Sequence, residues 1–168
     1  RGVSDEKIRA DWHGVNIIDD YAIVTCESIP RLTAISLTTD RVVDFPLKPK
    51  WGNSGPISAA VDDETGAVWI INGGNSVLEV TWNGTEWLDA KEKSLPFTLW
   101  FNTTSKTDDS LIFTEVQVGT NPGPRRVVEV ALPNFEVVNN NNLLFGSEKA
   151  PMPREVLWVP SSRQHIFF

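Results

Sequence analysis

A strand–turn–strand pattern recurs along this chain at nearly constant intervals, and it constrains the fold more than any other feature. Each copy consists of a short apolar run, a polar turn and a second apolar run. The runs are rich in β-branched and aromatic residues, which favour strands. The paired runs are residues 15–18 with 21–25, 57–61 with 67–71, 99–101 with 110–114, and 156–159 with 165–168. The second runs of successive copies lie 45, 44 and 55 residues apart.

Two more strand-like runs follow each of the first three copies. The third runs are residues 32–37, 77–82 and 127–132, and the fourth runs are 42–45, 87–90 and 135–138. Four strands in about 45 residues is the spacing of a β-propeller blade. The segment Ala67–Ile71 is apolar at every position, which is typical of a strand buried on both faces between neighbouring blades. We therefore expect an all-β propeller of four-stranded antiparallel blades. A β-sandwich of the same strands is the alternative.

The repeat boundaries predict a lead-in segment and a series of blades. The lead-in is residues 1–14, and the blades are 15–50, 51–95, 96–150 and a partial one at 151–168. This amounts to about three and a half blades, whereas closed propellers have roughly four to eight. The chain also stops inside an apolar run. We expect it to be part of a larger propeller.

The second copy resembles a kelch repeat. Its second strand runs from Gly66 into the pair Gly73-Gly74, and a third strand and then Trp87 follow. The last segment, 151–168, resembles the opening half of another such repeat. The resemblance implies a kelch-type propeller like the central domain of galactose oxidase, with Trp87 filling the wedge between adjacent blades. The first copy departs from the pattern with Cys26-Glu27 in place of the glycine pair, and the third with Glu115-Val116. Other propellers, NHL-like or lactonase-like, remain open.

Charge and composition narrow the classes of partner. The chain has 15 Lys and Arg against 22 Asp and Glu, a formal net charge of −7. This argues against a nucleic-acid-binding surface, which needs a basic face to neutralise phosphates. No apolar run approaches the roughly 18 residues of a transmembrane helix. Asn83-Gly84-Thr85 and Asn102-Thr103-Thr104 are N-glycosylation sequons. We expect a secreted or cell-surface glycoprotein.

Acidic pairs recur just before three of the second strands. They are Asp19-Asp20, Asp62-Asp63 and Asp108-Asp109. An Asp side chain bonds backbone N–H groups two residues on, so the pairs favour turns rather than calcium ligands. The copper radical site of galactose oxidase uses Tyr, Cys and His. The only Tyr and Cys here, Tyr21 and Cys26, fall on or beside one strand, so that site is not expected and no catalytic residue is predicted.

The leading hypothesis is a non-catalytic binding module that uses the loops of one face to hold a protein or glycan partner, without a cofactor. Its predicted binding residues follow the second strands; they are Glu27, Arg31, Asn72, Asn75, Glu115 and Arg125. The remainder of the propeller would be a further partner.

The alternative is a lactonase-like metal-dependent hydrolase or oxidase. Oxygens of Glu27, Asn72 and Glu115 would hold calcium at the central channel, and the remaining site residues would lie outside this chain.

Overall fold

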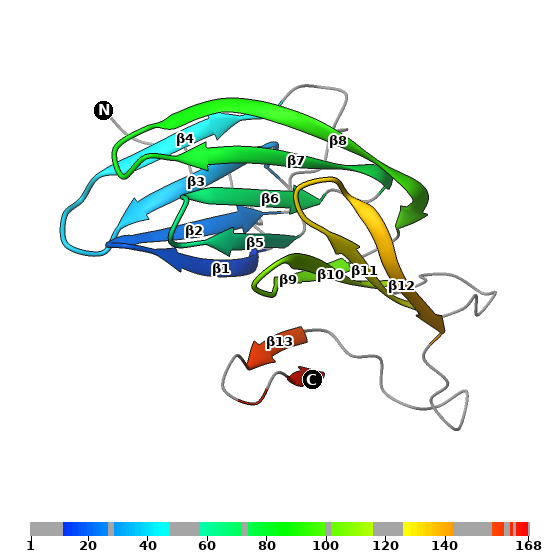
Figure 1. Ribbon diagram of the computed structural model, residues 1–168. Coiled ribbons are helices and arrows are strands. Elements are labelled where there is room, and N and C mark those ends of the chain that lie inside the picture. Colours follow the sequence, from blue (N-terminus) through cyan, green and yellow to red (C-terminus); the bar gives the residue numbers. More distant parts are fainter. Residues whose placement is uncertain are drawn as a thin grey trace.

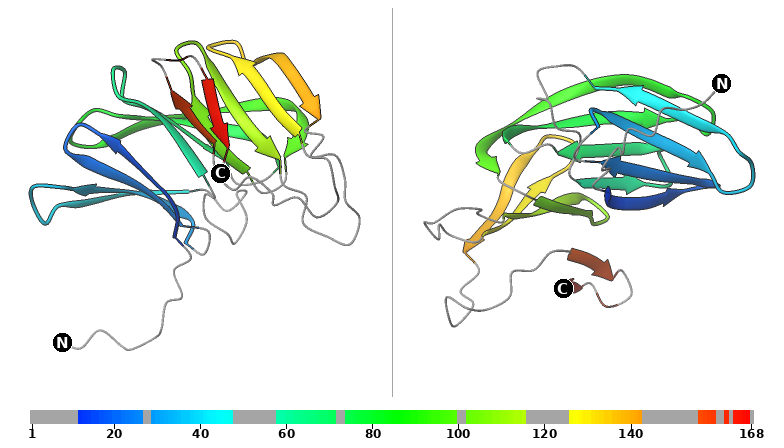
Figure 2. Two further views of the ribbon diagram at one scale, coloured as in Figure 1. Left: turned by 90° about the horizontal axis from the view of Figure 1, so that it is seen from below. Right: turned by 180° about the vertical axis from the view of Figure 1, so that it is seen from behind.

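The computed structural model describes residues 12–26, 29–47, 58–71, 74–99, 102–115, 126–142, 156–159, 162 and 164–167. Every regular element in these residues is a β-strand, and none of them forms a helix long and apolar enough to span a bilayer. The strands make three four-stranded antiparallel sheets and one two-stranded hairpin, and strand order follows chain order or its reverse in each sheet. Figure 2 shows the sheets fanned out in chain order, from the blue first sheet to the orange third.

We call the three sheets the first, second and third blades. The first contains β1 (Trp12–Ile18), β2 (Tyr21–Cys26), β3 (Arg31–Ser36) and β4 (Val42–Pro46). The second contains β5 (Ser58–Asp62), β6 (Ala67–Ile71), β7 (Gly74–Trp82) and β8 (Trp87–Leu99). The third contains β9 (Asn102–Lys106), β10 (Ser110–Glu115), β11 (Arg126–Ala131) and β12 (Glu136–Asn142). The hairpin pairs β13 (Val156–Val159) with β14 (Gln164–Phe167).

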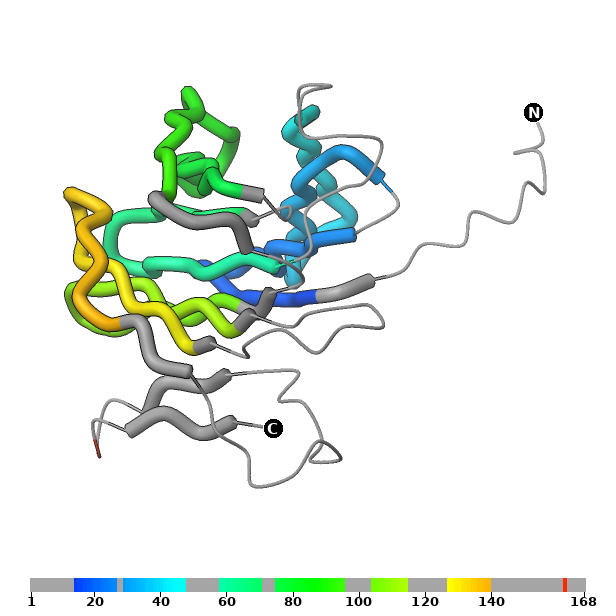
Figure 3. The backbone as a smooth tube through the Cα atoms, turned by 90° about the vertical axis from the view of Figure 1, so that its right-hand side faces the viewer, coloured from blue at the N-terminus to red at the C-terminus, as the bar shows by residue number. Residues whose placement is uncertain are grey.

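The first strands of successive sheets lie side by side. β1 contacts β5 and β5 contacts β9 (Figures 1 and 3), and β9 contacts β13 (Figure 1). The fourth strands lie at the opposite edges of the blades, as in a propeller whose innermost strands surround an axis. Three sheets stacked in succession are not the two face-to-face sheets of a sandwich. The predicted propeller is therefore confirmed, and the sandwich alternative is wrong.

Two apolar cores hold the blades together, and β6 belongs to both. Val68 and Ile70, both fully buried, pack against the first blade. Trp69, 5% exposed, packs against the third blade with Leu111 and Phe113. Successive residues of a strand point to opposite faces, so one apolar strand fills both cores. The prediction of burial on both faces of this strand is confirmed.

Trp87 joins the first two blades at their outer strands. Its indole Nε1 donates a hydrogen bond to the Val43 carbonyl, 44 residues earlier, at 3.0 Å. Its ring centroid lies 4.9 Å from that of Trp82 and 6.3 Å from that of Phe45. This confirms the wedge position that the resemblance implied for Trp87. Gly73, in the glycine pair, lies outside the described residues.

The first strand of the third blade was predicted at the wrong place. Residues 99–101 were expected as the strand and 102–109 as its turn. Instead β8 continues to Leu99, and the strand is Asn102–Lys106. This inner strand is polar, and the backbone N–H of Thr104 donates to Ser58 Oγ of the neighbouring inner strand at 3.0 Å. An axis-side strand need not be apolar, so a search for apolar runs missed it.

Candidate functional site

The structure describes only part of the site predicted after the second strands. Glu27, Asn72 and Arg125 lie outside the described residues, and so does the side chain of Glu115, whose backbone pairs with Asn102. Arg31 and Asn75 are exposed. The Arg31 Nη1 lies 2.9 Å from Asp44 Oδ2. Binding at these strand exits therefore stays a prediction.

The two sequons occupy different environments. Asn83 is exposed in the turn between β7 and β8, where its Oδ1 accepts hydrogen bonds from the Thr85 N–H, the Thr85 hydroxyl and the Glu86 N–H at 3.0, 2.9 and 2.8 Å. Gly84, between them, has a φ of 87°. Asn102 instead opens the inner strand β9. The side chain of Asn102 lies outside the described part of the structure, and use of either sequon stays a prediction.

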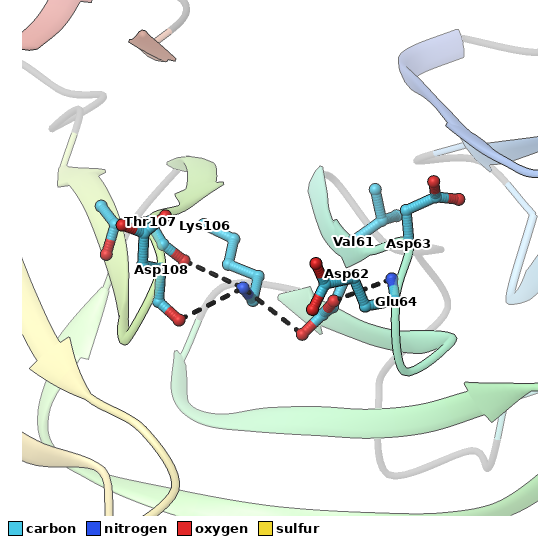
Figure 4. A pocket seen from close by; sticks show the side chains of 7 residues that line it. All are labelled: Val61, Asp62, Asp63, Glu64, Lys106, Thr107 and Asp108. Atoms are coloured by element: carbon cyan, nitrogen blue, oxygen red, sulfur yellow. Dashed lines mark hydrogen bonds and ion pairs between the residues drawn. The ribbon is translucent and has the colours of Figure 1, made fainter. Parts of the chain in front are cut away.

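A groove lies at the opposite ends of the strands, between the second and third blades. The turn from β5 to β6 forms one wall, and the turn from β9 to β10 forms the other (Figure 4). Its volume is about 430 Å³. The lining residues are Val61, Asp62, Asp63, Glu64, Lys106, Thr107 and Asp108. The turns of two stacked blades therefore create a concave, mostly acidic surface, which we call the turn-end groove.

Lys106 is the one basic residue among those that line the groove. Its Nζ lies 3.3 Å from Asp62 Oδ2 on the other wall, and the two side chains are only 17% and 16% exposed. The same Nζ donates to the carbonyl oxygens of Thr107 at 3.0 Å and Asp108 at 3.5 Å. Lys106 is thus held by both turns, and its charge is matched by Asp62.

Asp62 is the best-held carboxylate of the groove. Its Oδ1 accepts hydrogen bonds from the backbone N–H groups of Glu64 at 3.1 Å and Thr65 at 3.4 Å, which confirms the predicted turn chemistry at this residue. Burial raises the pKa of the Asp62 carboxyl, but the charge and hydrogen bond of Lys106, together with the bonds from Thr65 and Glu64, outweigh it. The net pKa lies below the ordinary 3.8, so Asp62 is ionised at neutral pH.

The remaining carboxylates of the groove belong to exposed residues, Asp63, Glu64 and Asp108. Asp63 Oδ1 also accepts a hydrogen bond from the Asp19 N–H of the first blade at 2.9 Å. The acidic pairs of three blades therefore lie at the same end of the molecule, and two are joined directly. Their recurrence was visible in the sequence, but the ion pair between Asp62 and the distant Lys106 was not.

No metal centre can be assembled from the described residues, because none of their His, Cys, Asp and Glu side chains forms a group of three suited to a metal ion. The calcium alternative depends on Glu27, Asn72 and Glu115. Those side chains are outside what the structure describes, so calcium binding there stays a prediction.

Comparison with known proteins bears on the fold. No protein-family model matches the sequence, and no curated protein matches it significantly. Several solved structures align over most of the chain, among them the following three. Hydrazine synthase of Kuenenia stuttgartiensis has a TM-score of 0.64 and 13% identity, with 99% of this chain and 45% of that chain covered. The WD40 repeats of RRP9 have a TM-score of 0.56 and 11% identity, with 100% of this chain and 52% of that chain covered. The WD40 propeller domain of Doa1 has a TM-score of 0.51 and 12% identity, with 89% of this chain and 58% of that chain covered.

The chain has the β-propeller fold. It spans about half the length of these structures, and at such low identity the likeness extends to the fold alone. Two of the three are WD40 propellers, so the kelch-type assignment of the blades stays a prediction.

Proposed function

We propose that this propeller is a non-catalytic binding module that holds a protein partner in the turn-end groove. The observation that carries the proposal is the groove itself, a concave surface between two stacked blades with exposed Asp63, Glu64 and Asp108. Recognition commonly uses loops that a rigid scaffold positions. The WD40 propellers that share the fold support this proposal.

The charges of the groove indicate a partner segment with basic side chains. Asp62 is already paired with Lys106. The carboxylates available to a partner are therefore those of the exposed residues Asp63, Glu64 and Asp108, which we call the rim carboxylates. Lys or Arg side chains would pair with them by charge-assisted hydrogen bonds. An exposed pair contributes only about 0.2–1 kcal/mol, so several rim charges must act together. Such contacts speed association and weaken as salt rises.

The experiment compares two charge-matched variants of the protein as baits. The groove variant carries Glu64→Lys and Asp108→Lys, which leaves Asp63 and its bond to the first blade intact. The control carries Asp89→Lys and Glu136→Lys on exposed positions of the outer strands β8 and β12. Proteins captured from the native source are quantified by mass spectrometry at low salt and at about 0.5 M salt, which screens exposed charges strongly.

We expect a partner that wild type and control retain, that the groove variant loses, and that high salt releases. A third bait, with Arg31→Glu and Asn75→Ala, tests the strand exits predicted from the sequence. Partner loss only with this third bait would move the binding face to the second-strand exits. Equal capture by wild type and all the variants would refute binding at either surface.

A further inference from the structure

The first blade has an apolar face that is distinct from the face packed on the second blade. On β1, Ile18 belongs to the core shared with the second blade, and Asn16 Nδ2 donates to the Ala59 carbonyl there at 3.1 Å. Neighbouring residues of a strand point to opposite faces, so Val15 and Ile17 point the other way. They are 63% and 50% exposed, and Val42 of β4 is 56% exposed.

The cross-strand register identifies the counterparts of these residues in the second blade. Val15 and Ile17 of β1 pair with two residues of β2. In the second blade, the equivalent residues of β5 pair with two residues of β6. The pairs are Val15–Val24 and Ile17–Ala22 in the first blade, and Ala59–Ile70 and Val61–Val68 in the second. Val15 and Ile17 therefore correspond to Ala59 and Val61 of the second blade.

The β6 residues that pair with Ala59 and Val61 pack on the first blade, and the matching residues of β10 pack on the second blade. Val68 and Ile70 are fully buried in the core with the first blade. Leu111 and Phe113, at the same positions of β10, are fully buried against the second blade. Ala22 and Val24 occupy this position in the first blade. The first blade thus carries residues at the same positions on its other face, and among the described residues no blade packs on that face.

The charged groups on this face are already paired. Asp44 of β4 lies 2.9 Å from Arg31 Nη1, and its other oxygen accepts a hydrogen bond from the Thr33 hydroxyl at 2.7 Å. An apolar sheet could therefore cover the face without leaving this carboxylate unpaired, which would be costly. Large exposed apolar residues in a row mark a surface that another protein element covers.

We propose that a further four-stranded blade of the same propeller ring packs on the face formed by Val15, Ile17, Ala22, Val24 and Ile35, where Ile35 of β3 is paired with Ala22. That blade packs on the first as the first packs on the second. Its contact face carries aliphatic or aromatic residues at the positions that correspond to Ile23, Leu32 and Ala34, which fill the existing core between the first two blades.

The test measures whether the face is covered in the full protein. Cysteine is introduced by Ile17→Cys and, as a matched control, by Leu88→Cys, because Ile17 is 50% and Leu88 42% exposed in the described structure. Leu88 lies on the outer strand β8 of the second blade, which has a described blade on each side. Wild type, with its buried Cys26, provides the background reactivity with a maleimide. We expect labelling at position 17 to be at least about tenfold slower than labelling at position 88, since burial removes reagent access.

Equal labelling rates in folded variants would overturn the proposal, and Val15→Cys replaces Ile17→Cys if that variant does not fold. The occupant is identified by a photo-crosslinking amino acid at position 17 and peptide mapping. A crosslink to an alternating apolar strand in another repeat of the same polypeptide supports the proposal. A crosslink to residues 1–11 of this chain, or protection that disappears on dilution together with a dimer mass, overturns it.

Discussion

Gly66 is the position where one added methyl group should cost most. It ends the turn between β5 and β6 with a φ of 71°, a backbone conformation that residues other than glycine rarely adopt. Its carbonyl accepts a hydrogen bond from the Trp82 N–H at 2.8 Å. A Cβ atom at Gly66 would lie 2.0 Å from the carbonyl oxygen of Trp82. Gly66→Ala therefore forces the backbone of Trp82, whose side chain is 2% exposed in the core, to move.

Gly84 provides the matched control because it isolates the backbone cost. Its φ is 87°, and a Cβ atom there would meet nothing within 4 Å. The left-handed conformation alone costs a non-glycine residue about 1–2 kcal/mol, and both variants carry that cost. Gly66→Ala adds a weakened hydrogen bond, about 0.5–1.5 kcal/mol, and displaced core packing, about 1–3 kcal/mol. We expect it to lower the free energy of unfolding by about 2–4 kcal/mol more than Gly84→Ala.

Urea denaturation followed by tryptophan fluorescence measures both variants against wild type, with the slopes compared to confirm that the same transition is observed. If Gly66→Ala does not fold while Gly84→Ala does, the steric argument holds with a larger cost than expected. If the two variants lose the same stability, the contact with Trp82 does not constrain this turn, and the reasoning is refuted.

Three further outcomes are expected. Because the pKa of Asp62 is lowered in the folded state, its stabilising contribution is present above the unfolded value of 3.8 and is lost as pH falls through the folded value. The difference in unfolding free energy between wild type and Asp62→Asn should therefore be constant near neutral pH and decrease as the pH falls into the acid range. A pH-independent difference would contradict this. In a secretory host, Asn83→Gln should remove a glycan mass, because Asn83 is exposed in a hairpin turn; an unchanged mass would contradict the use of this sequon. Calcium and EDTA should leave the melting temperature unchanged, whereas a calcium-dependent rise would favour the metal-dependent alternative.

The sequence predicted most strands close to their observed bounds, including the inner strands β1, β5 and β13, but misplaced the inner strand β9. Ala67–Ile71 was placed correctly because an unbroken apolar run has few other roles. Asn102–Lys106 was missed because its pairing with β10 requires no apolar side chains. The turn-end groove depends on blade stacking that brings Lys106 to Asp62, and no local pattern reports such a distant ion pair. The binding residues predicted after the second strands fall largely outside the described residues.

The sharing of β6 between two cores has a consequence for how the molecule unfolds. Val68 and Ile70 stabilise the contact with one neighbour, and Trp69 stabilises the contact with the other. Each blade then gains its stability largely from nearest neighbours, as in a one-dimensional array of coupled units. A destabilising substitution in the middle blade would therefore weaken the coupling of its unfolding to both adjacent blades. A substitution in an outer strand would affect the stability of its own blade. The centre of this array is thus where a single substitution is transmitted farthest.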